Sequence, residues 1–577
     1  MGQTLDFRNT NSLWASVAVE TLFRLGLKTA IVCPGSRSTP LTMAFARHLQ
    51  VEALPILDER SAAFFALGCA KRQFRPVALV CTSGTAGANF YPAIIEAYES
   101  GVPLMVFTAD RPPEMRDCAS GQTIDQQKLF GRFVKHYSEL AVPEATRAML
   151  NYLRQTLVHG WERAILPKAG PVHFNCPFRD PLPPIADGIT DALSASFDEK
   201  SFWRSTAPPA AAIFKAQAIP IHSWMRSQKG LIIAGSSIPS SPQQYCQAMK
   251  KLSLALGWPI LAEGLSPLRH YSSPDEAIIS TYDIVLRDTK RADSLVPEMV
   301  IQFGPLPTSK VLRAWLQQHQ PLHWLVSEGE NLDPLHGSTC FLFSDIEQIA
   351  ADFEGHSVET AESEYCRRWM SCEQLVRQAL DNGLEAEQTL LESKVVWLLS
   401  QHLPKKTPLF IANSMPVRDV EYFWPKSDRQ IQPFFSRGAN GIDGTLSTAM
   451  GIAHHNRPTV LLTGDLAFLH DTNGLLNAQQ LKGHLTAIVI NNQGGGIFEM
   501  LPISQFEPEF EKYFLTPQSV QISTLCQAYG LEHRLVRQVE DFIRCVESLP
   551  EQGMRVLEVM CDRQQSVRQR KSLLDVC

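Results

Sequence analysis

Short apolar runs alternate with longer segments of helical periodicity along most of the chain. In the first third, apolar runs lie at 29–36, 52–59, 75–84 and 102–111. Each ends in small or polar residues and precedes a helix-like segment such as SAAFFALGCAK. Buried strands that alternate with helices are typical of parallel βαβ units. The pattern therefore predicts an α/β fold with a parallel sheet covered by helices.

The alternation continues to the C-terminus and is weaker in the middle third. Further strand candidates lie at 230–239, 297–307, 321–330, 408–414, 432–438, 458–465, 485–492 and 554–562. A proline-rich stretch at 176–188 and a charged stretch before the final third are typical of boundaries between domains. We predict three doubly wound parallel-sheet domains, over residues 1–185, 190–358 and 385–577.

Composition narrows the class of protein. The chain has 577 residues, of which 44% are hydrophobic and 19% charged, as in a soluble protein with several cores. Its net charge of −6 argues against nucleic acid as a partner. There is no uninterrupted apolar run of about 18 residues, so no membrane span is expected. The 13 cysteines are scattered and form no C-x-x-C pair, which predicts reduced thiols and a cytoplasmic location.

Two apolar runs in the final third end on side chains that carry oxygen. PTVLLTGD ends at Asp465, and LTAIVINN ends at Asn492, 27 positions later. We expect DTNGLLNAQQ, between them, to be a helix with a capping residue at its start. A βαβ unit of this length makes its two strands parallel, so both end at the same edge of the sheet. Asp465 and Asn492 should therefore lie side by side.

Carboxylate, amide and backbone oxygens together suit magnesium better than zinc. Gly464 and residues 494–496 lack side chains where a diphosphate would approach backbone N–H groups. Taken singly, Asp465 is more simply a loop-capping residue and NNQGGG a turn. The two stretches in combination favour a magnesium diphosphate site made of Asp465, Asn492 and Gly494.

The pair of motifs resembles the thiamin diphosphate (ThDP) binding motif, with Leu466 where most families have glycine. Six stretches extend the resemblance: CPGSRSTPL, DERSAAFFALG, TSGTAGANFYPAIIEA, TADRPPE, RGANGIDG and NNQGGGIFEMLP. In this order they resemble the 2-succinyl-5-enolpyruvyl-6-hydroxy-3-cyclohexene-1-carboxylate synthase family of menaquinone and phylloquinone biosynthesis. That family also has leucine after GD.

The resemblance implies three domains of the ThDP enzyme type, with ThDP and Mg²⁺ as cofactors and Mn²⁺ as an alternative ion. It implies decarboxylation of 2-oxoglutarate, release of CO₂ and 1,4-addition of the succinyl carbanion to isochorismate. Glu59 matches the relay glutamate, which needs an apolar surrounding. Because the first and last domains of such enzymes face each other across a subunit interface, a homodimer or homotetramer is expected.

Site residues follow from the same resemblance. The catalytic residues would be Glu59, Arg37 and Gln122. The substrate contacts would be Ser36, Arg37, Lys310, Arg418, Arg437, Phe498 and Leu501. The cofactor contacts would be Glu59, Gln122, Ser414, Gly441, Ile442, Gly464, Asp465, Leu466, Asn492, Gly494 and Gly495. The chain departs from the family pattern at Gly121 and Val311, where some members carry asparagine and arginine.

Other functions remain open at this stage. A ThDP-dependent 2-oxoacid decarboxylase or carboligase of acetohydroxyacid synthase type would need a different pocket, and the latter type often binds FAD. A nucleotide-dependent oxidoreductase lacks support, because no G-x-G-x-x-G opens a helix. A regulatory protein without activity would not need Glu59, Asp465 and Asn492 together. Considered alone, each arginine is more commonly a structural salt-bridge partner, and Glu59 a favourable first-turn helix residue.

Overall fold

The computed structural model of the protein describes residues 5–204, 206–208, 218–353 and 363–575. Residues 1–4, 205, 209–217, 354–358 and 576–577 of the predicted domains lie outside these ranges. The chain forms two compact units. Unit 1 comprises Met1–Ile213, Ser436–His455 and His470–Lys482, and unit 2 comprises Phe214–Phe435, Asn456–Leu469 and Gly483–Cys577. Every helix among the described residues is too short or too polar to span a bilayer.

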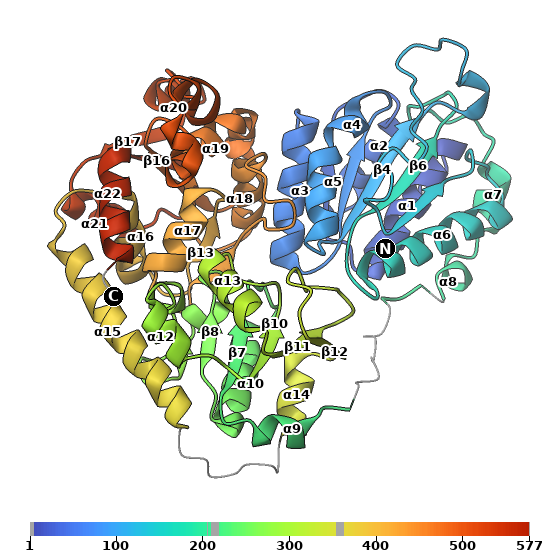
Figure 1. The fold of residues 1–577 in the computed structure, drawn as a ribbon. Helices are drawn as coiled ribbons and strands as arrows, with labels where there is room; N and C mark the ends of the chain where they lie inside the picture. Colours follow the sequence, from blue (N-terminus) through green and yellow to red (C-terminus); the bar gives the residue numbers. More distant parts are fainter. Residues whose placement is uncertain (1–4, 205, 209–217, 354–362, 576–577) are drawn as a thin grey trace. The chain divides into compact units, whose positions relative to one another are not determined.

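Unit 1 is built on a six-stranded parallel sheet of order β2-β1-β3-β4-β6-β5. The strands are β1 (Thr29–Val32), β2 (Glu52–Pro55), β3 (Val77–Cys81), β4 (Leu104–Asp110), β5 (His136–Glu139) and β6 (Val172–Pro177). The helices are α1 (Thr10–Leu25), α2 (Thr39–Arg47), α3 (Glu59–Gln73), α4 (Ala86–Asn89), α5 (Tyr91–Glu99), η1 (Pro113–Met115), α6 (Arg147–Ile165), α7 (Asp191–Ser196), α8 (Glu199–Phe202), α18 (Thr445–Ala453) and η3 (Thr472–Gln480). In Figure 1, α1, α2 and α6 cover one face of this sheet, and α3 and α5 cover the other.

Unit 2 contains the second sheet, of order β12-β11-β10-β7-β8-β9, all parallel. Its strands are β7 (Gly230–Ala234), β8 (Ile260–Ala262), β9 (Ile278–Ile279), β10 (Met299–Phe303), β11 (Leu322–Ser327) and β12 (Thr339–Phe343). Its helices are α9 (Ile221–Arg226), α10 (Pro242–Leu256), η2 (Pro267–Arg269), α11 (Tyr282–Val285), α12 (Thr289–Ser294), α13 (Lys310–His319), α14 (Ile346–Asp352) and α15 (Glu364–Ala386). This strand order is the one typical of dinucleotide-binding folds.

The third sheet, also in unit 2, has the order β14-β13-β15-β16-β18-β17. Its strands are β13 (Pro408–Ile411), β14 (Gln432–Phe434), β15 (Thr459–Gly464), β16 (His484–Asn491), β17 (Glu532–Val536) and β18 (Gly553–Met560). The helical segments are α16 (Glu392–His402), α17 (Met415–Phe423), α19 (Asp465–His470), η4 (Gly496–Met500), η5 (Pro502–Gln505), η6 (Phe510–Leu515), α20 (Ile522–Ala528), α21 (Val539–Glu547) and α22 (Arg563–Leu574). The order repeats that of the first sheet, strand for strand.

The predicted fold class is confirmed by these three parallel sheets. The helix predicted over 471–480 is present, but as the 3₁₀ helix η3, which follows the short α-helix α19. Asp471 precedes η3 but does not cap it with its side chain. Its buried carboxylate accepts hydrogen bonds from the backbone N–H and hydroxyl of Ser447 on α18 instead. Asp471, the predicted capping residue, thus joins η3 to α18 within unit 1.

Candidate functional site

The carboxyl edge of the third sheet brings together the two polar residues that the sequence singled out. Gly464 of β15 pairs with Ile490 of β16 in parallel register, so Asp465 and Asn492 follow neighbouring strand ends. The Asp465 carboxylate accepts a hydrogen bond of 2.9 Å from the backbone N–H of Gly494. The prediction that these strands are parallel and end at one edge is confirmed.

Both residues are buried, and each has an oxygen suited to a cation. Burial raises the pKa of Asp465 to about 6, against the effect of hydrogen bonds from backbone N–H groups. The Asn492 amide nitrogen donates to Glu392 Oε1 at 2.8 Å. Among the described residues, the buried Oδ1 of Asn492 has no hydrogen-bond partner. A buried polar atom without a partner is rare in folded proteins, and a bound ion is one explanation.

Glycine is required in the loop after Asn492 for reasons of space. Gly494 has a φ of +140°, and a Cβ there would lie 2.5 Å from the carbonyl oxygen of Leu515. The backbone N–H of Gly495 donates to that same carbonyl. By contrast, nothing lies within 4 Å of a Cβ built on Gly464, so the end of β15 faces open space. The loop is therefore compact, while the adjoining strand end is accessible.

Neighbouring strand ends carry other predicted residues of unit 2. Ser414, after β13, has a φ of +72°, and its carbonyl accepts a hydrogen bond of 2.7 Å from Arg418 Nη1. Burial lowers the pKa of Arg418. Strands β13 and β15 are neighbours with crossovers in opposite directions, which is where ligands bind in open α/β sheets. Ser414 and Asp465 thus follow the two strands of one switch point.

The remaining predicted residues of unit 2 are less tightly grouped. Phe498 lies in η4, and its ring contacts that of Phe514 at 5.8 Å between centroids. Leu501 and Leu466 are half-buried, and Lys310 is an exposed residue at the start of α13, after β10 of the second sheet. Lys310 therefore lies beside a different sheet from Asp465 and Asn492.

In unit 1, Glu59 is the first residue of α3, and Asp58 caps this helix by accepting from the backbone N–H of Ser61. Burial raises the pKa of the Cys33 thiol, and the charge of Glu59 raises it further. Since Cys33 directly follows β1, Glu59 lies at the carboxyl edge of the first sheet. Its side chain is half-buried.

The segment that precedes α18 is held against the same helix layer. The Glu96 carboxylate on α5 accepts hydrogen bonds from the backbone N–H groups of Gly438 and Ala439. A Cβ on Gly444 would lie 1.9 Å from the ring of Phe64 on α3, so only glycine allows this approach. These contacts fix both ends of the short segment 438–444, which carries Gly441 and Ile442 and directly follows Arg437. All three are half-buried.

Arg37 is the most enclosed of the predicted arginines. Its Nη1 donates to the carbonyl of Phe178 at 3.0 Å and lies 3.8 Å from Asp180. Among the described residues, its buried Nε has no hydrogen-bond partner. Burial, together with the charge of Arg111, lowers the pKa of Arg37. A guanidinium with an unused donor at a sheet edge is suited to an anionic ligand.

Ser36 directly precedes this arginine, and Gln122 lies in a loop that contacts the segment after β3. Ser36 is exposed, and Gln122, also exposed, donates to the carbonyl of Ser83 at 3.0 Å. Gly35 allows the loop after β1 to approach that after β3, since its Cβ would lie 2.2 Å from Thr82 Cβ. Strands β1 and β3 form the switch point of the first sheet.

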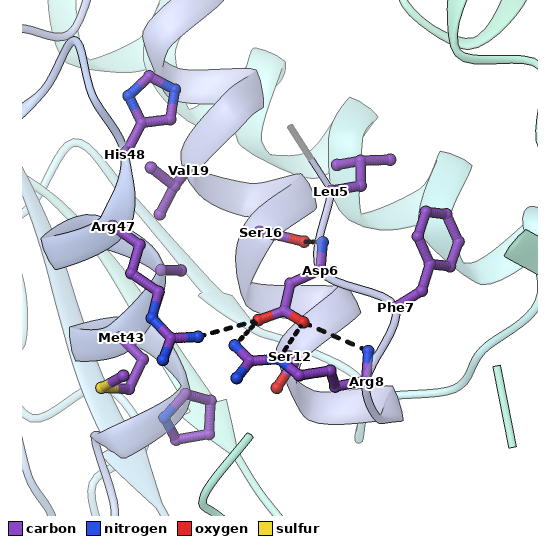
Figure 2. A pocket seen from close by; sticks show the side chains of 12 residues that line it. Leu5, Asp6, Phe7, Arg8, Ser12, Ser16, Val19, Met43, Arg47 and His48 are labelled. Carbon is purple, nitrogen blue, oxygen red and sulfur yellow. Dashed lines mark hydrogen bonds and ion pairs between the residues drawn. The ribbon is translucent and has the colours of Figure 1, made fainter. Parts of the chain in front are cut away.

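A cavity of about 450 Å³ lies elsewhere in unit 1, between α1 and α2 (Figure 2). Its acidic group, Asp6, is paired with Arg8 and lies 3.8 Å from Arg47. None of the predicted site residues lines it. We assign no function to this cavity, because its charged groups already satisfy one another.

Sequence reasoning missed Glu392 and Arg570, which are buried behind Asn492. Glu392 opens α16 within ESKVVWLL, where a glutamate in the first turn of a helix is a weak signal. Arg570 lies in the polar helix α22, where it resembles its exposed neighbours. Their partners are distant in sequence, so no local pattern could identify them.

Comparison with known proteins matches family models across the chain. These are the N-terminal TPP binding domain of thiamine pyrophosphate enzymes (residues 14–129), the middle domain (192–411) and the C-terminal TPP binding domain (417–559). A curated 2-succinyl-5-enolpyruvyl-6-hydroxy-3-cyclohexene-1-carboxylate synthase of Gloeothece citriformis is 54% identical over 97% of both chains. The chain belongs to this synthase family. The synthase of Acaryochloris marina is 51% identical, over 100% of this chain and 99% of that protein.

Structural comparison supports the fold of this synthase family member. The X-ray structure of a putative thiamin diphosphate-dependent enzyme from Mycobacterium smegmatis matches with a TM-score of 0.67. It covers 95% of this chain and 99% of the other at 16% identity, which supports the shared fold alone.

Proposed function

We propose that the protein catalyses the ThDP-dependent decarboxylation of 2-oxoglutarate and the 1,4-addition of the succinyl unit to isochorismate. The products would be 2-succinyl-5-enolpyruvyl-6-hydroxy-3-cyclohexene-1-carboxylate and CO₂. Membership of the synthase family supports this reaction. The observation that carries the cofactor assignment is the pair of Asp465 and Asn492 at one sheet edge, with Asn492 Oδ1 lacking a partner among the described residues.

The residues at this edge fit a divalent cation and a diphosphate. Asp465, Asn492 and the backbone of Gly494 would hold Mg²⁺ or Mn²⁺ through oxygen atoms. The open space at Gly464 would admit the diphosphate near Leu466 and Gly495. Bound ThDP would supply the nucleophilic carbon and stabilise the charge left by decarboxylation. In unit 1, Glu59 would exchange a proton with the aminopyrimidine of the cofactor, while Gln122, Gly441 and Ile442 would contact it, with Ser414 of unit 2.

Both substrates carry two carboxylates, so the protein must supply local cationic groups. We assign this role to Arg37, Arg418, Arg437 and Lys310, with Ser36 as a polar contact. Arginine suits carboxylates because its planar group binds both oxygens at once. The buried, incompletely paired guanidinium of Arg37 supports its place in this set. Phe498 and Leu501 would form the apolar wall beside isochorismate.

We infer that the protein works as a homodimer or homotetramer, with Glu59 of one protomer serving the cofactor held by Asp465 of its partner. We also place it in the cytoplasm and in quinone biosynthesis. The 13 cysteines are scattered along the sequence and form no C-x-x-C pair, which fits a reducing compartment. Light scattering on the purified protein tests the assembly, since a monomer with full activity would contradict it.

The test of the activity follows loss of isochorismate absorbance in the presence of ThDP, Mg²⁺ and 2-oxoglutarate. Each component is omitted in turn, and loss that requires all four supports the proposal. CO₂ release from a 2-oxoacid without consumption of isochorismate would instead indicate a decarboxylase or another carboligase. A yellow protein with bound flavin would favour the acetohydroxyacid synthase type.

A further inference from the structure

A buried carboxylate lies directly behind the proposed metal ligand Asn492. Glu392, the first residue of α16, is 2% exposed and uses its two oxygens for different partners. Its Oε1 accepts a hydrogen bond of 2.8 Å from the amide nitrogen of Asn492. Its Oε2 accepts one of 2.7 Å from Nη2 of Arg570. The residue therefore connects the sheet edge to helix α22.

This contact determines which end of the Asn492 amide faces the cation. An ionised carboxylate can only accept hydrogen bonds, so the NH₂ end of the amide must point toward Glu392. The carbonyl end then points away, and among the described residues Oδ1 has no hydrogen-bond partner. Only this oxygen end can coordinate a metal, because the amide nitrogen has no lone pair to offer.

Glu392 is in turn held rigidly. Arg570 is 1% exposed and binds Asp419 through two further hydrogen bonds, of 2.7 and 2.9 Å. Asp419 belongs to α17, the helix that carries Arg418. Buried charges persist only when paired and hydrogen-bonded, and these three side chains satisfy one another. Metal ligands are commonly oriented by such outer partners.

The glycine loop leaves room for this arrangement. A Cβ on Gly496 would lie 2.6 Å from the amide nitrogen of Asn492 and 3.8 Å from Glu392 Oε1. Even alanine at this position would press on the hydrogen bond between the two side chains. The third glycine of NNQGGG is thus explained by the contact behind the proposed metal site.

We propose that Glu392, held by Arg570, is a positioning residue that fixes the amide oxygen of Asn492 toward the divalent cation. This inference rests on the proposed function, because it assumes that Asn492 binds the metal. A purely structural role for Glu392 would require only that the buried charges pair. Substitutions that exchange hydrogen-bond donors and acceptors, while keeping the size of the side chain, distinguish the positioning role of Glu392 from a purely structural one.

The first variant is Glu392→Gln. The guanidinium of Arg570 can only donate, so it retains the oxygen of the introduced amide. The NH₂ end then faces Asn492, whose amide must turn its own oxygen inward and its NH₂ toward the cation. Affinity for Mn²⁺, measured by electron paramagnetic resonance of free Mn²⁺ with ThDP present, should fall roughly 10–100-fold, as for other outer partners of metal ligands.

Two further variants separate positioning from stability. Asp419→Asn removes a carboxylate from the same guanidinium but leaves Asn492 untouched, so the Kd for Mn²⁺ should stay near the wild-type value. The double variant Glu392→Gln with Asn492→Asp restores a donor–acceptor pair with reversed polarity and leaves one carboxylate oxygen for the cation. It should recover most of the lost Mn²⁺ affinity.

If Glu392→Gln does not fold, Gly496→Ala takes its place, since it displaces the Asn492 amide while keeping every charge. Wild-type Mn²⁺ affinity in the folded variant, with loss in Asp465→Ala, would overturn the positioning role and leave the proposed function standing. An equal loss in Asp419→Asn, or a double variant without recovery, would also overturn it. Unchanged Mn²⁺ affinity in Asp465→Ala would instead overturn the proposed metal site itself.

Discussion

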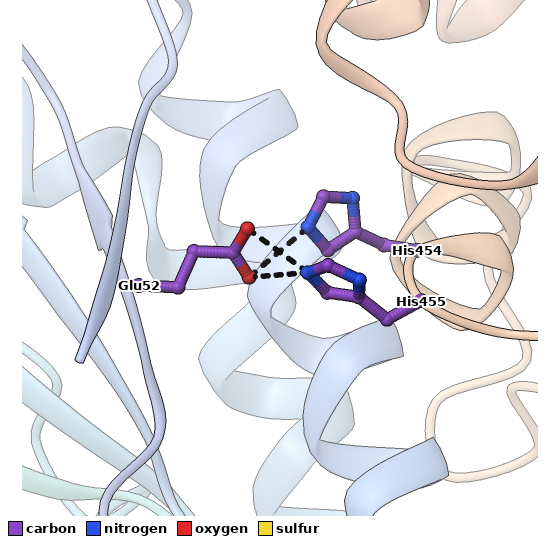
Figure 3. A group of neighbouring side chains, drawn as sticks. All are labelled: Glu52, His454 and His455. Carbon is purple, nitrogen blue, oxygen red and sulfur yellow. Dashed lines mark hydrogen bonds and ion pairs between the residues drawn. The ribbon is translucent and has the colours of Figure 1, made fainter. Parts of the chain in front are cut away.

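A cluster of charged side chains in unit 1 yields a prediction about stability. Glu52, on the edge strand β2, accepts hydrogen bonds from His454 at 3.3 Å and His455 at 2.9 Å (Figure 3). It also accepts one of 2.6 Å from Lys482. His454 and His455 follow α18, and Lys482 follows η3. The cluster thus ties the segments 436–455 and 470–482 to the first sheet, and Glu52→Gln should loosen them.

The expected cost depends on how far each partner is exposed. A hydrogen bond to a charged group contributes about 1.5–3 kcal/mol when buried, but exposed ion pairs contribute only about 0–1 kcal/mol. His454 is 1% exposed, whereas Lys482 is 58% exposed, so the contact with His454 should dominate. We expect Glu52→Gln to destabilise unit 1 by about 2 kcal/mol at neutral pH. For a unit of this size, that corresponds to a Tm lower by roughly 4–8 °C.

The difference in Tm between wild type and Glu52→Gln should decrease at low pH. Burial alone would raise the pKa of Glu52, but the hydrogen bonds from His454, Lys482 and His455 outweigh it and lower the pKa below its ordinary 4.5. A lowered pKa in the folded state contributes stability that is complete above the unfolded pKa and is lost as pH falls toward the folded value. The part of the Tm gap between wild type and Glu52→Gln that depends on ionisation of Glu52 should therefore be complete above about pH 5.5 and shrink below 4.5.

The assay is a thermal melt of the full protein at pH 7.5, 6, 5 and 4, with Glu162→Gln as control. Glu162 is an exposed residue of α6, so its substitution removes the same charge without these partners. Equal Tm values for wild type and Glu52→Gln at pH 7.5, or a gap that does not shrink at pH 4, would refute the reasoning.

The same melts address the chemical nature of the cluster. A glutamate and two histidines with ligand atoms within 4.8 Å of one another could also hold a metal ion. The ammonium group of Lys482 already contacts the carboxylate, so we interpret the cluster as an ion-pair network. In the absence of ThDP and added Mg²⁺, EDTA should therefore leave the wild-type Tm unchanged. A fall in Tm that Zn²⁺ reverses would show that interpretation to be wrong.

Three further predictions concern the proposed active site. Glu59→Gln should bind ThDP by calorimetry yet lose nearly all turnover, because the proton-exchanging carboxylate is gone; wild-type turnover would remove Glu59 from the mechanism. Asp465→Ala should weaken ThDP and Mg²⁺ binding more than substrate binding, and an unchanged cofactor affinity in titration would contradict the assignment. Arg418→Ala should raise the KM of one substrate about 10–100-fold through loss of a charged contact, whereas unaltered KM values would place Arg418 outside the pocket.

Most of the fold could be predicted because interior strands of a parallel sheet are buried on both faces and read as apolar runs. Twelve of the eighteen strands that the structure describes were predicted. Four of the missed ones, β5, β9, β12 and β17, lie at an edge of their sheet, whereas the edge strands β2 and β14 were predicted. Strands β5 and β17 are only partly buried and consist mostly of polar residues, whereas β9 has two residues and β12 has a short apolar stretch, CFLF, with exposed positions.

Interior strand β6 was missed for a different reason. VHFNCP is fully buried, but two of its residues are polar. His173 and Asn175 both contact the Thr108 hydroxyl of β4, at 2.7 and 2.9 Å. Asn175 also donates to Asp110 at 2.8 Å. Polar groups that satisfy one another across a sheet interrupt the apolar pattern without exposing the strand.

The candidate site, too, could be predicted only in part from the sequence. Asp465 and Asn492 could be placed together because strand direction and the length of a βαβ unit fix where both strands end. Glu392, Asp419 and Arg570 could not be placed together from the sequence. Their contacts join helices α16, α17 and α22, and Arg570 is 151 positions from Asp419 and 178 positions from Glu392. Strand-end geometry thus locates the oxygen atoms for a cation, but their orientation depends on side chains that only the folded structure brings behind them. For that reason, exchanging the polarity of the Glu392–Asn492 pair tests the site more sharply than removing either side chain.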